Sequence, residues 1–426
     1  MTLRDPNYKE RLLEKQLQRH LKAFGAVEII GAMWCGKTWM ANAYGLSKIN
    51  ISDPQTKAIV EADLSLAFEG GKPHVIDEWQ ELPSLWDAAR LHIDSRPKER
   101  GLYILTGSST PKKEETSHSG TGRISRLHLR PMSLFETGDS NGIVSLSGLF
   151  EGQFKKARVE TDIKKISYFI CKGGWPGALG LEIEDPQLIP NQYIDTLLSF
   201  VGRKNNMNEN RLRRFLGSLA RNLGQAVTYK TIAADITEAQ DDSIPQNHID
   251  QLLTLFKDRF IVEDLNGWDA PVRSKSRVRI KPKHCFVDPS LPAALLGVNN
   301  ERLLLDGQLF GILFEELVLR DLRIYASAME NALPDPVKYY RDSDNLEVDA
   351  IIELRDGRWA GVEIKLGEAR VNEGIKNLLR LKNKVASNPA ARNPEPTFLA
   401  VITGKSDFCR VSPEGVYVFP ITALGG

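Results

Sequence analysis

Eight residues near the N-terminus have the types and spacing of a phosphate-binding loop. The segment Gly31-Ala-Met-Trp-Cys-Gly-Lys-Thr38 has two glycines separated by four residues and followed by lysine and a hydroxyl residue. It follows the apolar run 27–30 and precedes a helical pattern, which is the context that this motif requires. Backbone N–H groups of such a loop, together with a helix N-terminus, bind phosphate oxygens. The residues expected to contact a nucleotide are Gly31, Ala32, Met33, Trp34, Cys35, Gly36, Lys37, Thr38 and Trp39.

A second motif supplies the remaining groups for nucleotide hydrolysis. Lys37 is expected to reach the β- and γ-phosphates, and the Thr38 hydroxyl is expected to bind Mg²⁺. Farther along the chain, the apolar run His74-Val-Ile ends in Asp77-Glu78. Asp77 is expected to hold Mg²⁺ and Glu78 to polarise the attacking water. The two motifs together predict an ATPase whose cofactors are ATP and Mg²⁺.

Four further residues are candidates for catalysis, each with a plainer alternative. The apolar run 102–105 ends in Thr106-Gly-Ser108, where a sensor of the γ-phosphate would lie, although a simple polar turn has the same composition. Downstream, Arg123 and Arg126 are candidates for an arginine finger, because a planar guanidinium suits the dispersed charge of phosphoryl transfer. Solvated surface arginines are the alternative.

The order of these motifs resembles a prokaryotic family of AAA-type ATPases that carry an uncharacterised C-terminal domain. The resemblance is carried by GAMWCGKT, VIDEWQELPSLWDAAR, YILTGSS and GRISRLHLRPMSLFE, and later by GGWPGAL, NQYIDTLL and VEIKLG. It spans nearly the whole chain and implies an ATPase domain, a winged-helix module and a nuclease-like tail. It implies no particular substrate.

The middle of the chain independently suggests a winged helix. We expect helices over 209–223, from Thr228 and after Pro245, the last with Ile249, Leu252, Leu253 and Phe256 inward, and wing strands over 260–265 and 277–286. Alternate residues of a strand share a face, so the odd-numbered basic residues would form one stripe. These are Arg273, Lys275, Arg277, Arg279, Lys281 and Lys283. Such a stripe suits a nucleic-acid backbone, most simply DNA, and the alternative is an edge strand protected from aggregation.

Carboxylates near the C-terminus resemble the PD-(D/E)xK nuclease core. Asp349 and Glu363 are expected at facing positions of a β-hairpin, with Lys365 on the face of Glu363. In the nuclease core such carboxylates bind Mg²⁺ and the lysine stabilises charge or activates water. Glu315 or Glu316 would add the acidic residue from the preceding helix. An inactive remnant or an ordinary cross-strand ion pair is the alternative.

The elements that carry these residues predict a multidomain α/β protein. We expect an AAA-type parallel sheet with an N-terminal helix over 1–150, a helical lid or linker over 151–204, a winged-helix-like domain over 205–303 and a nuclease-like α/β domain over 304–426. The N-terminal helix, over 6–23, would be exposed, with Leu12, Leu13, Leu17 and Leu21 on one stripe.

Composition sets the remaining expectations. With 42% hydrophobic and 26% charged residues and a net charge of +1, any affinity for nucleic acid must come from a local patch. Four widely spaced cysteines, no apolar signal segment and no run long enough to span a membrane predict a cytoplasmic protein without a membrane partner. Whether the chain forms a homo-oligomer is left open by the sequence.

Overall fold

The computed structural model describes residues 2–109, 120–181, 184–225, 227–236, 246–270 and 280–426. The chain divides into two compact units. Unit 1 comprises Met1–Met132 and two short later segments, Trp175–Gly177 and Lys257–Ile261. Unit 2 comprises the remaining residues from Ser133 to Gly426.

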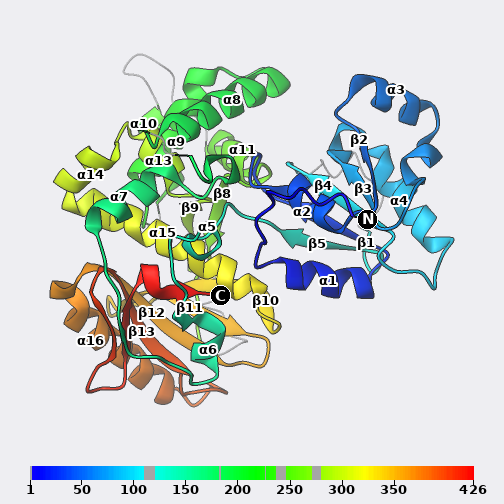
Figure 1. The fold of residues 1–426 in the computed structure, drawn as a ribbon. Coiled ribbons are helices and arrows are strands. Elements are labelled where there is room, and N and C mark those ends of the chain that lie inside the picture. The colour runs from blue at the N-terminus through cyan, green and yellow to red at the C-terminus, as the bar shows by residue number, and fades with distance from the viewer. Residues whose placement is uncertain (1, 110–119, 182–183, 226, 237–245, 271–279) are drawn as a thin grey trace. The chain divides into compact units, whose positions relative to one another are not determined.

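Unit 1 is built on a five-stranded parallel sheet with the strand order β2-β3-β4-β1-β5 (Figure 1). The strands are β1 (Ala26–Ile30), β2 (Ser47–Asn50), β3 (His74–Asp77), β4 (Tyr103–Gly107) and β5 (Ile124–His128). Because all five run in one direction, their carboxyl ends meet along a single edge. The phosphate-loop motif, the Asp-Glu pair and the Thr106 segment all follow strands at that edge.

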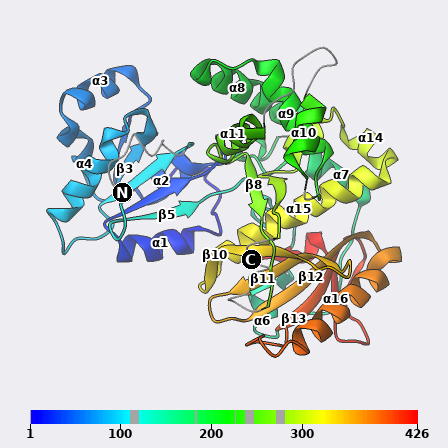
Figure 2. The ribbon, with the colours of Figure 1, turned by 180° about the vertical axis from the view of Figure 1, so that it is seen from behind.

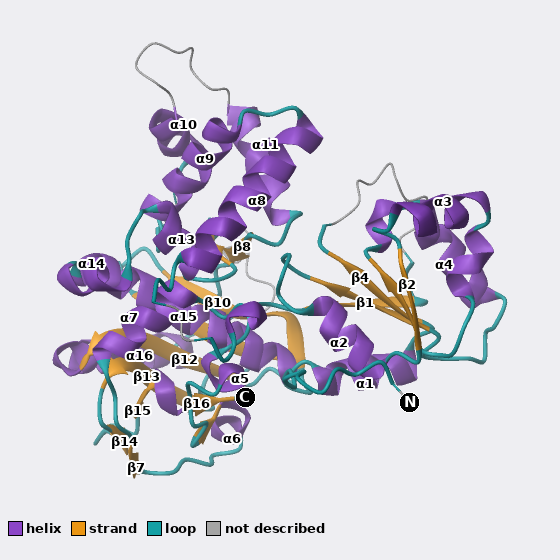
Figure 3. Cartoon of the chain, turned by 45° about the horizontal axis from the view of Figure 1, so that its top comes forward, coloured by secondary structure: helices purple, strands orange, loops and turns teal. Residues whose placement is uncertain are grey.

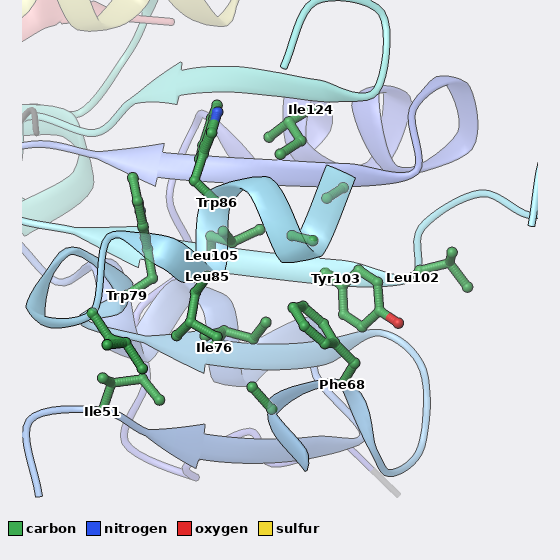
Figure 4. Packing of buried hydrophobic residues seen from close by; sticks show 14 of the residues in the cluster. Ile51, Phe68, Ile76, Trp79, Leu85, Trp86, Leu102, Tyr103, Leu105 and Ile124 are labelled. Atoms are coloured by element: carbon green, nitrogen blue, oxygen red, sulfur yellow. The ribbon is translucent and has the colours of Figure 1, made fainter. Parts of the chain in front are cut away.

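Alternate residues of these strands pack into two separate cores. Val27, Val75 and Ile104 face α1 (Glu14–Ala23) and α2 (Lys37–Tyr44). Ile76, Tyr103 and Leu105 face α3 (Pro54–Ala62), η1 (Leu64–Phe68) and α4 (Ser84–Asp94). Figure 3 shows the two helix pairs on opposite sides of the sheet, and Figure 4 shows the second core, in which Trp79 and Trp86 stack with ring centroids 4.9 Å apart. Successive residues of each strand point to opposite faces, so a sheet covered by helices on both faces sends alternate residues into two cores.

The N-terminal helix differs from the sequence-based expectation. It begins at Glu14 rather than near residue 6, and Leu13 and Leu17 are buried in the first core. Leu13, Leu17 and Leu21 of the expected stripe pack into the first core, whereas Leu12 lies before the helix, so the helix packs on the sheet instead of standing in solvent. The segment before it is therefore held close to the phosphate loop.

Helices in the middle of unit 2 begin where we expected them, near residues 209, 228 and 246, whereas the two helices between residues 290 and 305 were not predicted. The helices of this region are α7 (Ile163–Lys172), α8 (Leu188–Asn205), α9 (Glu209–Arg221), α10 (Tyr229–Ile236) and α11 (Gln246–Lys257), followed by α13 (Ser290–Leu295) and α14 (Asn300–Leu305). The expected inner stripe of α11, from Ile249 to Phe256, is buried. Two antiparallel strands, β8 (Val262–Leu265) and β9 (Lys283–Phe286), follow α11 and occupy parts of the predicted wing.

The C-terminal part of unit 2 is a seven-stranded sheet with the order β10-β11-β12-β13-β15-β14-β7. Its strands are β10 (Ala332–Arg341), β11 (Glu347–Leu354), β12 (Trp359–Gly367), β13 (Phe398–Lys405), β14 (Phe408–Val411), β15 (Tyr417–Pro420) and β7 (Ala157–Arg158). The helix α15 (Gly307–Ala328) packs on β10, β11 and β12, and α16 (Val371–Ala386) packs on β11, β12 and β13 (Figure 2). Among the described residues, no helix is both long and apolar enough to cross a bilayer.

The segment after residue 132 packs in unit 2, although we expected the first domain to extend to residue 150. Its helices are α5 (Leu134–Thr137) and α6 (Leu146–Phe150), and its strand β6 (Val144–Ser145) pairs with β16 (Leu424–Gly425). The backbone N–H of Leu134 donates to the buried Asp321 carboxylate over 3.0 Å. Pairing between segments so far apart in sequence leaves no local pattern from which it could be predicted.

Candidate functional site

The phosphate loop connects β1 to α2 and depends on glycine at both of its ends. Gly31 has φ +151°, and a Cβ atom there would lie 2.0 Å from the carbonyl oxygen of Leu129. Gly36 has φ +100°, a left-handed conformation that glycine adopts without strain. Lys37 is the first residue of α2, and its buried Nζ donates to the carbonyl oxygens of Gly31 (3.1 Å) and Ala32 (2.8 Å). The loop thus places a cation and a helix N-terminus together.

The side chains predicted to bind Mg²⁺ and to sense the γ-phosphate meet at Asp77. The Thr38 hydroxyl donates to Asp77 Oδ1 over 2.8 Å, and the Thr106 hydroxyl donates to the same oxygen. Asp77 and Thr106 are both buried, at the ends of the neighbouring strands β3 and β4. The parallel sheet therefore brings together three residues that are far apart in the sequence.

Glu78 has a strained backbone and a restrained side chain. Its φ of +54° and ψ of +43° are left-handed, which is uncommon for a residue other than glycine. The N–H of Glu78 donates to Thr106 Oγ1 over 3.2 Å, and its carboxylate accepts bonds from Ser108 Oγ (3.2 Å) and from Gln80 Nε2. Such strain is characteristic of functional sites. Ser108 thus lies against the group predicted to polarise water.

Two residues of this site were not identified from the sequence. Lys48, on β2, places its Nζ 2.7 Å from Asp77 Oδ2, the carboxylate oxygen that Thr38 does not contact. Gln80 contacts Glu78 from the turn that follows it. Lys48 belongs to an edge strand with no motif of its own, so only the pairing of β2 with β3 reveals its position.

The donor set fits Mg²⁺ bound together with ATP. Mg²⁺ prefers oxygen ligands and is usually held by one or two protein groups plus substrate phosphates. Thr38 and Asp77 supply a hydroxyl and a carboxylate at one point. No group of three His, Cys, Asp or Glu residues within the described parts of the chain is arranged to hold a metal ion by itself. A cation at Thr38 and Asp77 would therefore depend on the nucleotide.

The other residues of the loop differ in their exposure. Ala32 and Cys35 are buried, Met33 is half-buried, and Trp34 and Trp39 are 46% and 47% exposed. The Cys35 thiol donates to the Leu129 carbonyl over 3.3 Å, so Cys35 fills the base of the loop. One exposed indole, Trp34, lies in the loop and the other, Trp39, directly follows it.

Neither predicted arginine finger lies at the phosphate loop within one chain. Arg123 precedes β5 and donates to Asp94 over 2.8 Å, which holds the pKa of that carboxyl below its usual value. Arg126 lies at the middle of β5 and donates to the buried Glu28 over 2.6 Å. Burial raises the pKa of Glu28, and Arg126 opposes that shift. Each arginine therefore has a carboxylate partner away from the carboxyl edge of the sheet.

The predicted carboxylate site of unit 2 lies on β11 and β12. Their register pairs Ala350 with Val362, which brings Asp349 beside Glu363. Lys365 Nζ lies 3.3 Å from Asp349 Oδ2 and also contacts Glu363, which accepts a further bond from Asn377 of α16 over 3.2 Å. Burial, followed by the charge of Asp349, raises the pKa of Glu363 to about 8. The geometry is that of a lysine held between two carboxylates.

The wing strand β9 contributes a second lysine to this region. Lys283 is 3% exposed, and its Nζ lies 2.5 Å from Glu347 and 3.8 Å from Glu315. Burial, followed by the charge of Asp349, raises the pKa of Glu315. Glu316 points elsewhere and accepts the Phe286 N–H over 3.1 Å. Of the two helix acids, Glu315 is therefore the one associated with the carboxylate site.

The basic stripe is only partly described by the structure. Arg273, Lys275, Arg277 and Arg279 lie outside the described residues. Lys281 is exposed, as predicted, whereas the prediction that Lys283 faces solvent is wrong. The cause is tertiary packing: Tyr339 of β10 accepts the Trp268 N–H over 2.7 Å and donates its hydroxyl proton to the Lys281 carbonyl over 2.6 Å, so the hairpin lies on the C-terminal sheet. Alternation alone cannot reveal such a contact.

Comparison with known families separates the chain into three regions. Residues 23–138 match the family model of the AAA domain. Residues 163–302 and 310–424 match two families that are each described as a domain of unknown function, DUF8612 and DUF4143 respectively. Among curated proteins, no sequence relative of the chain is found. The first match contains the phosphate loop and the Asp77 cluster, so the region that matches the AAA domain is also the one that carries this site.

The solved structures to which the chain is similar are distant from it. The Walker-type ATPase PABY2304 of Pyrococcus abyssi is 13% identical, with a TM-score of 0.42 over 69% of this chain and 97% of that one. The Orc1 protein of Aeropyrum pernix, solved in complex with DNA, is 13% identical, with a TM-score of 0.23 over 68% of this chain and 93% of that one. TM-scores this low establish neither a shared fold nor a shared function.

Proposed function

We propose that unit 1 binds ATP with Mg²⁺ and hydrolyses it. The observation that carries this proposal is the convergence of Thr38, Thr106 and Lys48 on Asp77, with Glu78 next to it, at the end of a phosphate loop. The match of residues 23–138 to the AAA domain supports the same conclusion.

Each residue of the site would have a separate role in ATP hydrolysis. The loop N–H groups and Lys37 would bind the phosphates, and Lys37 would exchange its bonds to Gly31 and Ala32 for bonds to phosphate oxygens. Bound Mg²⁺ would neutralise the charge that develops on the phosphate oxygens. Glu78, held by Ser108 and Gln80, would accept a proton from the attacking water. Thr106, whose hydroxyl donates to Asp77, would connect this proton transfer to the residue that holds Mg²⁺.

We further propose that the nucleotide cycle is coupled to nucleic-acid binding through the middle of the chain. Three helices followed by an antiparallel hairpin are the elements of a winged helix, and the stretch 273–281 carries five basic residues at alternate positions. Basic side chains with this spacing suit a phosphate backbone, most simply that of DNA. The alternative is a nucleotide-switched protein in which slow hydrolysis only changes the affinity for another partner.

Steady-state ATP hydrolysis, measured with and without duplex DNA over a range of salt concentrations, tests both parts of this proposal. Strong stimulation by DNA would support coupling to nucleic acid. Slow turnover that is indifferent to DNA would favour the nucleotide switch. Turnover unchanged by Lys37→Ala would reject the ATP site itself, because the charge on the β- and γ-phosphates would then be irrelevant.

A metal-dependent nuclease in unit 2 is a second candidate function. The supporting observation is that Asp349, Glu363 and Lys365 meet on one face of β11 and β12, and that Glu315 shares the cation Lys283 with Glu347 of β11. Carboxylates with a lysine can bind Mg²⁺ and activate water. The competing proposal is a scaffold, since two lysines already neutralise part of the cluster.

A further inference from the structure

The segment that precedes α1 is fastened to unit 1 beside the phosphate loop. Its anchor is Glu14, whose carboxylate accepts bonds from the Tyr8 hydroxyl (2.8 Å), the Tyr44 hydroxyl (2.6 Å) and the Arg11 backbone N–H (2.9 Å). Tyr44 is the last residue of α2, the helix that follows the loop. The N-terminal segment is therefore joined to the nucleotide-binding helix through buried polar groups.

Arg11 extends from this segment onto the phosphate loop itself. Its Nη1 donates to the Cys35 carbonyl over 2.9 Å, and its Nη2 donates to the Arg130 carbonyl over 2.8 Å. The side chain is 5% exposed, and a Cβ atom built on Gly36 would lie 3.5 Å from Nη1. One guanidinium thus connects the loop to the chain that follows β5, to which the Cys35 thiol also donates.

The bond to Cys35 has a consequence for the next N–H group. In a trans peptide the C=O and the following N–H point to opposite sides, so holding the Cys35 oxygen toward Arg11 fixes the direction of the Gly36 N–H. Phosphate loops bind their ligand through such N–H groups. Gly36, with its left-handed φ, is a point where the peptide could otherwise rotate.

We infer that Arg11 is a positioning residue for the phosphate loop. It fixes the Cys35–Gly36 peptide in the orientation that binds phosphate, without contacting the nucleotide. The inference rests on the proposed binding of ATP in unit 1. A planar guanidinium can bond two carbonyl groups at once in a fixed geometry, whereas the ammonium of lysine is a single point on a flexible chain. Lysine at this position should therefore replace Arg11 only in part.

Nucleotide binding by calorimetry tests the inference, with Arg4→Ala as the matched control. Arg4 lies in the same segment and carries the same charge, but it pairs with Glu10 at the surface over 2.8 Å. Arg11→Ala should weaken Mg·ADP binding by about tenfold to a hundredfold, the usual effect of losing hydrogen bonds from a charged group. Arg11→Lys should lie between wild type and alanine, and millimolar guanidinium should partly restore the alanine variant. Adenosine, which has no phosphate, should bind all four proteins alike.

Amide hydrogen exchange of residues 31–38 without nucleotide gives a second readout. Exchange should accelerate in Arg11→Ala and remain unchanged in Arg4→Ala, because Arg11 bonds the loop and Arg4 pairs with Glu10 instead. Equal weakening of ADP and adenosine binding would overturn the inference, since it would indicate a general loss of structure. Unchanged exchange would overturn it as well. If wild type binds no ADP, the proposed ATP site fails, and the exchange measurement alone decides whether Arg11 restrains the loop.

Discussion

The phosphate site of unit 1 and the carboxylate site of unit 2 are both made of lysines and acids, but they balance charge differently. In unit 1, Lys37 bonds two backbone carbonyls, which can be exchanged for phosphate oxygens. In unit 2, Lys365 lies between Asp349 and Glu363, and Lys283 lies against Glu347. In the first site Lys37 is therefore available to an anionic ligand, although Lys48 pairs with Asp77 over 2.7 Å, whereas both cations of the second site are already paired with carboxylates.

This difference bears on what each site can do. A lysine that bonds neutral carbonyls gains energy when a phosphate replaces them, because charged pairs form stronger hydrogen bonds. A carboxylate that is already paired with a buried lysine gives up that pairing when it binds a metal ion. The structure therefore supports ligand binding in unit 1 more strongly than metal binding in unit 2.

The largest effects are expected from changes in the phosphate site. Lys37→Ala should abolish nucleotide binding and lower ATP turnover by at least about 10³-fold, since the charge on the β- and γ-phosphates is lost. Glu78→Gln should lower turnover by a similar factor while ATP still binds, because Asp77 and the loop remain. Turnover and equilibrium ATP binding, measured on the same preparations, separate the two. Glu61→Gln, on the exposed face of α3, is the control. Wild-type turnover in Glu78→Gln would contradict the role assigned to Glu78.

A smaller effect is expected at the carboxylate site. If unit 2 is a nuclease, Glu363→Ala should lower Mg²⁺-dependent cleavage of DNA by about 10²-fold and leave ATP turnover intact. Cleavage should be assayed on linear, circular and single-stranded DNA, with a chelator as the blank. Cleavage that persists in Glu363→Ala would have to arise elsewhere. No cleavage by wild type on any of these substrates would establish the scaffold and would sharpen the contrast between the two sites.

Two buried groups, one in each unit, should change stability with pH in opposite directions. Burial, followed by the charge of Lys72, lowers the pKa of His74 to about 4, from an ordinary value of 6.5. The unfolded chain therefore binds the extra proton first, and unit 1 should lose stability as the pH falls from 6.5 to 4, by at most about 3 kcal/mol. The pKa of Glu363 is raised instead, so unit 2 should lose stability as the pH rises from 4.5 towards 8.

Hydrogen exchange of β3 and β12 across this pH range would distinguish the two responses. His74→Gln should reduce the loss of stability of unit 1 at acid pH. Glu363→Gln should reduce the loss of stability of unit 2 at alkaline pH. His74 Nδ1 is within hydrogen-bonding distance of the Ser47 hydroxyl, and glutamine can replace that contact. The same pH response in both units would contradict the assignment of either residue.

The sequence predicted best what is local and worst what depends on packing between distant segments. The phosphate loop and the ends of β3 and β4 are short motifs attached to apolar strands, and Asp77, Thr38 and Thr106 do converge. Lys48 and Arg11 approach the same site from segments without a motif, so only the folded chain reveals them. Residues 133–150 were assigned to the wrong unit for the same reason, because β6 pairs with a strand from the opposite end of the chain.

The smallest predicted effect separates two adjacent members of the basic stripe, Lys281 and Lys283. Lys281 is exposed, so Lys281→Gln should reduce the slope of log K against log salt for duplex DNA by about 0.9, the value of one lost phosphate contact. Lys283 is buried against Glu347 and Glu315, so Lys283→Gln should leave the slope unchanged and instead lower the stability of unit 2, because it removes the buried cation from between these two carboxylates. Titrations at several salt concentrations, with denaturation curves of both variants, measure the two quantities. A slope altered by Lys283→Gln and not by Lys281→Gln would mean that the hairpin leaves the C-terminal sheet when DNA binds. The hairpin would then contribute both to DNA binding and to the carboxylate site, instead of to the carboxylate site alone.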